Sequence, residues 1–107
     1  MRDDIDQNRA RLEMEQRLRA INAEIIHDAI PELSVTRLKP FFELTARARA
    51  AYIKALVALA DDTPGLPAAD KVREMELLRR TYDELIHGAH AIEAAIERGY
   101  IDARGDG

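Results

Sequence analysis

Apolar side chains recur every three or four residues over three long stretches of the chain, and this is the period of amphipathic α-helices. Proline-bearing breaks separate the stretches: Pro31 follows the first, and a loop from Asp61 to Pro67 follows the second. Proline disfavours a helical conformation in the residue before it, so each break ends a helix. The pattern predicts three helices, over about residues 3–29, 40–60 and 68–98.

The predicted ends of these helices follow from proline and glycine. Pro40 is expected in the first turn of the second helix, where its missing N–H removes no helical hydrogen bond. Gly99 is expected to stop the third helix in a left-handed conformation. Residues 1–99 are therefore predicted to form one all-α domain, an elongated up-down-up three-helix bundle. Residues 100–107 are expected to form a loose C-terminal tail.

The first two helices carry more apolar side chains than one core-facing stripe needs. The second has an apolar edge beyond its main stripe, and the first has apolar residues on two sides. The main stripe of the second helix is expected to consist of Phe41, Leu44, Ala48, Tyr52, Ala55, Leu56 and Leu59. Extensive exposed apolar surface marks an interface, so a homo-oligomer or an obligate partner is expected. The residues predicted to form this interface are Met14, Ile21, Ile25, Phe42, Ile53 and Val57.

Composition narrows the class of protein. The 107 residues are 47% apolar and only 5% aromatic, and they include no cysteine, which excludes a disulfide scaffold, a thiolate zinc site and a cysteine nucleophile. No apolar run is long enough for a transmembrane helix, and a cytoplasmic location is expected.

The net charge of -4 disfavours general binding to nucleic acid, because such binding neutralises many phosphates together. One basic segment keeps that partner open as a minor alternative, although its side chains are expected to face acidic neighbouring helices. Its basic residues are Arg37, Lys39, Arg47, Arg49 and Lys54.

A Glu-x-x-His pattern occurs twice, as Glu24 with His27 and as Glu84 with His87. Residues three apart share a helical face and can offer an oxygen and a nitrogen to one metal ion. Two such pairs resemble the di-iron sites of ferritin-like bundles, and the resemblance implies iron, manganese or zinc bound at a subunit interface. Against this, both pairs point away from the predicted apolar stripes.

The sequence thus favours a protein without enzymatic activity or cofactor, a helical oligomerisation or adaptor module inside a larger assembly. Its expected partners are further copies of itself and an unidentified protein. Long antiparallel helices with an interfacial face would suit a phage-type packaging factor or a similar assembly factor. The alternative is a ferritin-like metal-binding protein.

Overall fold

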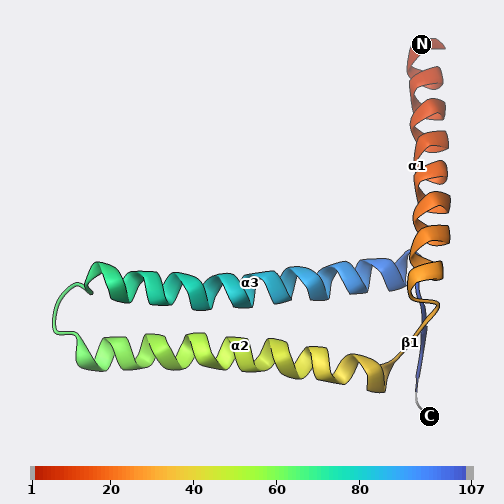
Figure 1. Cartoon of the computed structure of the whole chain (residues 1–107). Helices are drawn as coiled ribbons and strands as arrows, with labels where there is room; N and C mark the ends of the chain where they lie inside the picture. The colour runs from red at the N-terminus through yellow and green to blue at the C-terminus, as the bar shows by residue number, and fades with distance from the viewer. Residues whose placement is uncertain (1, 106–107) are drawn as a thin grey trace. The chain divides into compact units, whose positions relative to one another are not determined.

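The computed structural model describes residues 2–105 and confirms an all-α protein of three long helices joined by short connections (Figure 1). Its elements are α1 (Arg2–Ala29), β1 (Glu32–Ser34), α2 (Val35–Asp62), α3 (Ala69–Glu97) and β2 (Asp102–Arg104). The chain divides into two compact units. The hairpin unit is Thr36–Ile92, and the terminal unit joins the residues up to Val35 to those from Glu93 onward.

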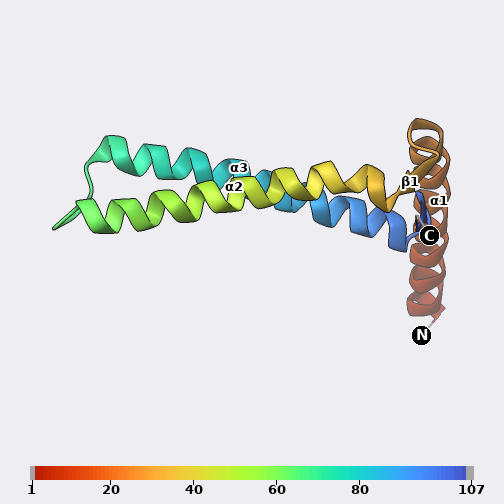
Figure 2. The ribbon, with the colours of Figure 1, turned by 90° about the horizontal axis from the view of Figure 1, so that it is seen from below.

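In the hairpin unit, α2 and α3 run antiparallel and cross at a shallow angle (Figure 2). A seam of half-buried residues runs along both helices in alternating steps of three and four, the spacing of a coiled coil. These residues are Leu38, Phe41, Thr45, Ala48, Tyr52, Ala55 and Leu59 on α2, and Met75, Leu78, Tyr82, Leu85, Ala89 and Ile92 on α3. The regular seam explains why two long helices pair over their whole length.

Two residues that are unusual in or beside a coiled-coil seam, a glycine and a threonine, are accommodated by their surroundings. A Cβ atom on Gly88 would lie 3.3 Å from Cζ of Phe41, so a glycine inside α3 makes room for that ring. Thr45 lies in the seam, and its hydroxyl donates a hydrogen bond to the carbonyl oxygen of Phe41 at 3.0 Å. The polar group of Thr45 is therefore satisfied by its own helix.

The prediction that the second helix begins at Pro40 is wrong. α2 begins at Val35, so Pro40 lies inside the helix. Ser34 ends β1 and directly precedes the helix, and serine is a favoured N-cap residue. Starting earlier adds Leu38 to the seam, and this burial offsets the backbone hydrogen bond that Pro40 cannot donate.

In the terminal unit, α3 ends at Glu97, and Gly99 forms the left-handed stop that the sequence predicts. Gly99 has φ of +76°, and its N–H donates to the carbonyl oxygen of Ile96 at 3.1 Å. The N–H of Tyr100 donates to the carbonyl oxygen of Ala95 at 2.8 Å. Together these two bonds form a Schellman motif, which satisfies the last carbonyl groups of the helix and reverses the chain.

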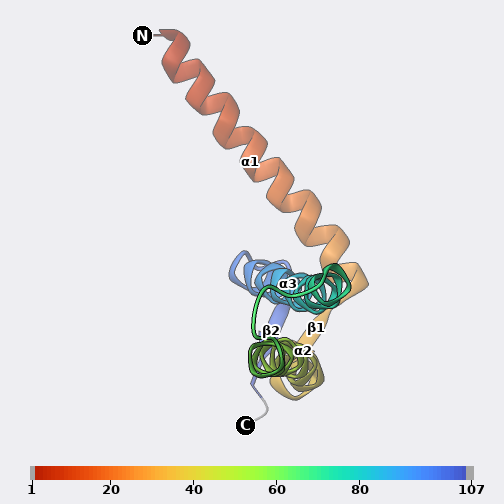
Figure 3. The same cartoon turned by 90° about the vertical axis from the view of Figure 1, so that its left-hand side faces the viewer.

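The expected loose tail, residues 100–107, is different in its described part, because residues 100–105 include two buried residues and β2. Residues 106 and 107 lie outside the described residues. Among the described residues, the buried ones are Leu33, Tyr100 and Ile101. Leu33 belongs to β1, which pairs in parallel with β2 (Figure 3). An ion pair between Arg104 and Glu32 joins the same two strands. The chain reversal at Gly99 brings Tyr100 and Ile101 into this small core, and the pairing of β2 with β1 holds the residues that follow.

No helix within residues 2–105 is both long and apolar enough to cross a membrane.

Candidate functional site

α1 carries a continuous exposed apolar stripe. Met14, Leu18, Ile21 and Ile25 follow one another at spacings of four, three and four, and each is more than half exposed. On a helical wheel they occupy an arc of roughly 60°. The half-buried residue Ile26 lies outside this arc. The structure thus leaves the α1 residues of the predicted interface uncovered.

The hairpin unit carries a second exposed apolar surface, a groove between α2 and α3. Phe42 and Ile53 stand at its α2 edge and are 49% and 52% exposed. Val57, at 57%, follows one turn beyond Ile53 on the same face of α2. The residues that line this hairpin groove are Phe42, Thr45, Ala46, Arg49, Ala50, Ile53, Ile86 and Ala89.

Small side chains give the hairpin groove its depth. Ala46 and Ala50 lie between Phe42 and Ile53 on the face of α2 and leave room beside these larger side chains. Ala46 and Ala50 are not among the interface residues predicted from the sequence, and the helical pattern assigns Ile86 and Ala89 of α3 to an ordinary core face. A signal was present, because alanines four residues apart between larger apolar residues produce a concave helical face. The α3 residues that line the groove could not be predicted in the same way, because their position opposite α2 depends on the register of the hairpin.

Arg49 closes one side of the hairpin groove through its contacts with Tyr82. Its Nε donates to the Tyr82 hydroxyl at 2.8 Å, and Nη2 donates to the same oxygen. The guanidinium carbon also lies 5.2 Å from the centre of the Tyr82 ring. This is a cation–π distance, so Arg49 links α2 to α3 by two kinds of contact.

Other members of the basic segment have partners on their own helix. Lys39 and Arg47 approach the carboxylate of Glu43 at 3.8 Å and 4.0 Å, each one helical turn away. These pairs are exposed, and such pairs contribute little stability. These side chains were expected to face acidic residues of neighbouring helices. The acidic partner of both cations lies instead on α2 itself. Binding to nucleic acid through this segment stays a prediction.

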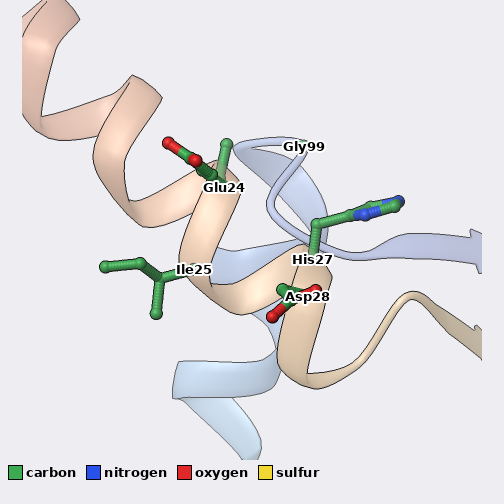
Figure 4. Close-up of a pocket in the computed structure, with 6 residues that line it drawn as sticks. Glu24, Ile25, His27, Asp28 and Gly99 are labelled. Carbon is green, nitrogen blue, oxygen red and sulfur yellow. The ribbon is translucent and has the colours of Figure 1, made fainter.

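The first Glu-x-x-His pair lies at the end of α1, where Glu24, His27 and Asp28 border an open depression with Gly99. Figure 4 shows the side chains of Glu24, His27 and Asp28 spreading in different directions from the helix. His27 instead approaches Asp102, with 3.3 Å between Nε2 and Oδ2. Both side chains are exposed, so this contact is a surface interaction between α1 and β2.

The second pair, Glu84 and His87, lies on α3 in the hairpin unit, and both residues are exposed. Within residues 2–105 no three histidine, aspartate or glutamate side chains come together as a metal-binding group. The metal site therefore stays a prediction. Elemental analysis of protein purified without chelator tests it: bound metal that is lost in both His27→Ala and His87→Ala would support the site.

Comparisons of this chain with protein-family models, with curated proteins and with solved structures found no match.

Proposed function

We propose that this chain is a non-enzymatic helical oligomerisation or adaptor module that works inside a larger assembly in the cytoplasm. The observation that carries the proposal is the hairpin groove, an apolar surface edged by the half-exposed Phe42 and Ile53. A groove of this kind suits the apolar face of a helix from another chain. An apolar surface that takes up a helix of another chain would suit an assembly factor, for example a phage-type packaging component.

Burial energetics support self-association. Removing apolar surface from water contributes about 25 cal/mol for each Å². Phe42, Ile53 and Val57 each expose about half of their area or more in the isolated chain. A second copy that covers all three would gain several kcal/mol, on the order of 1 kcal/mol for each side chain. Contiguous exposed apolar surface of this kind is typical of protein interfaces.

The test is the oligomeric state of the chain, measured by light scattering across a range of concentrations. We expect a defined oligomer, and we expect Ile53→Asp and Val57→Asp to shift the mass towards that of the monomer. Ala51→Asp is the matched control, because Ala51 is exposed on the opposite face of α2. It adds the same charge and should leave the mass unchanged. A native chain that is monomeric at every concentration would overturn the proposal.

A further inference from the structure

We propose that α1 pairs with α1 of a second copy in antiparallel orientation, through the exposed stripe Met14, Leu18, Ile21 and Ile25. This inference rests on the proposed self-association and assigns it a second surface with a stated geometry. The stripe has the four-three-four spacing of a coiled-coil seam. In an antiparallel pair centred between residues 19 and 20, Met14 faces Ile25 of the second copy, and Leu18 faces Ile21.

The charges at the two ends of the stripe select the orientation. Extending the seam by one position in each direction reaches Arg11 before Met14 and Asp28 after Ile25. In the antiparallel pair, Arg11 faces Asp28 of the second copy, and symmetry repeats this contact at the other end. In a parallel pair, Arg11 would face Arg11 and Asp28 would face Asp28. Facing like charges disfavour the parallel arrangement.

The positions beside the seam select the same orientation. Arg17 and Glu24 lie on the same edge of the stripe, one heptad apart. An antiparallel pair brings Arg17 next to Glu24 of the second copy, twice by symmetry, whereas a parallel pair brings Arg17 next to Asn22. Arg17 bonds Glu13 of its own helix at 3.0 Å in the free chain. The arginine fork has five N–H donors, so it can serve both carboxylates.

The face of α1 that packs within the terminal unit is a different one. Ala23 and Ile26 are half-buried there, and both lie more than about 90° from the centre of the stripe. A second copy can therefore cover the stripe without displacing the contacts of the terminal unit.

Single cysteines test the geometry, because the native chain has none. Met14→Cys and Ile25→Cys proteins are prepared separately, mixed in equal amounts and oxidised, and the products are identified by intact mass. We expect disulfide-linked pairs that contain one chain of each kind. In the antiparallel pair, position 14 of one copy lies about 16 Å along the helices from position 14 of the other, too far for a disulfide, whose Cα atoms lie within about 7 Å. Each protein oxidised alone should therefore stay unlinked.

Charge reversal gives a second readout that does not depend on cysteine. Arg11→Asp converts two attractive contacts into two repulsive ones, and we expect the dissociation constant to rise roughly tenfold. Arg11→Asp combined with Asp28→Arg restores opposite charges and should return it to within about threefold of the native value. Arg9→Asp, on the outer face of the helix, is the matched control and should have no effect.

The outcomes separate this inference from the proposed function. Links between two Met14→Cys chains would show a parallel pair and overturn the inference. A native oligomer with no cross-link in the mixture would also overturn it, and the proposed function would stand on the hairpin groove. A monomeric native chain would overturn both.

Discussion

Replacing Ile101 by alanine tests the most unexpected part of the fold, the small core of the terminal unit. Ile101 is 5% exposed, the lowest value among the three residues of this core. The substitution removes three carbon atoms, and each buried methylene contributes about 0.8 kcal/mol, so the lost transfer energy is about 2.4 kcal/mol. An unfilled cavity adds to this, and the expected loss of stability is about 2–4 kcal/mol.

Hydrogen exchange followed by mass spectrometry measures this loss locally. Peptides that cover the turn after α3 include the amides of Gly99 and Tyr100, which are hydrogen-bonded in the native protein. A loss of about 2–4 kcal/mol lowers their protection by about 30- to 900-fold. If the terminal unit is stabilised by less than this amount, its protection should vanish altogether. Peptides from the middle of the hairpin unit should keep theirs, because Ile101 lies outside that unit.

Leu66→Ala is the matched control. It also removes three carbon atoms, but Leu66 lies in the loop between α2 and α3 and is 96% exposed. The control should change protection by less than about twofold, the range of an ordinary surface substitution. If Ile101→Ala had no larger effect than Leu66→Ala, the burial of Ile101 in the terminal unit would be refuted, and with it the small core that it forms with Leu33 and Tyr100.

Two further predictions concern single contacts, each measured by chemical denaturation. Gly99→Ala should destabilise the protein by about 1–2 kcal/mol, because φ of +76° is unfavourable for a residue with a Cβ atom. Gly105→Ala, where φ is not positive and the added Cβ meets nothing within 4 Å, should be neutral, and equal effects would contradict the left-handed stop. Tyr82→Phe removes the oxygen that accepts from Arg49 and should cost about 0.5–1.5 kcal/mol. Tyr52→Phe is the matched control, because it removes the same hydroxyl group from another tyrosine of the seam. If it destabilised the protein as much as Tyr82→Phe, the result would argue against the Arg49 contact.

The sequence predicted those features of the fold that local chemistry determines. Helical periodicity and prolines placed the three helices, and Gly99 marked the end of α3 because glycine tolerates a positive φ. The predicted interface residues are exposed as expected, for example Ile25 at 63%, although the interface itself is untested. Such exposure is predictable because an apolar residue on a second face of a helix lies outside the main seam.

The features that the sequence did not predict depend on contacts between distant residues. β1 and β2 have three residues each and are separated by most of the chain. Segments this short show no hydrophobic periodicity from which their pairing could be predicted. Leu44 and Leu56 were expected in the main stripe of the second helix but are 44% and 41% exposed. The observed seam keeps Leu59, which was expected there, and adds Thr45, because the pairing with α3 follows a three-four repeat and not a broad apolar arc.

Two self-complementary surfaces on one chain would set the size of the assembly. A pair of α1 helices and a pair of hairpin grooves would each be a twofold interface, in which both copies use the same patch. A chain that carries both builds a closed tetramer or an extended array, and losing either surface leaves a dimer held by the other. We therefore expect Ile53→Asp alone and Ile21→Asp alone each to stop at a dimer, and the double variant to be a monomer by light scattering. A fall to monomer with either single variant would show that the two faces act as one interface. That result would leave the proposed self-association in place but remove its division into two surfaces.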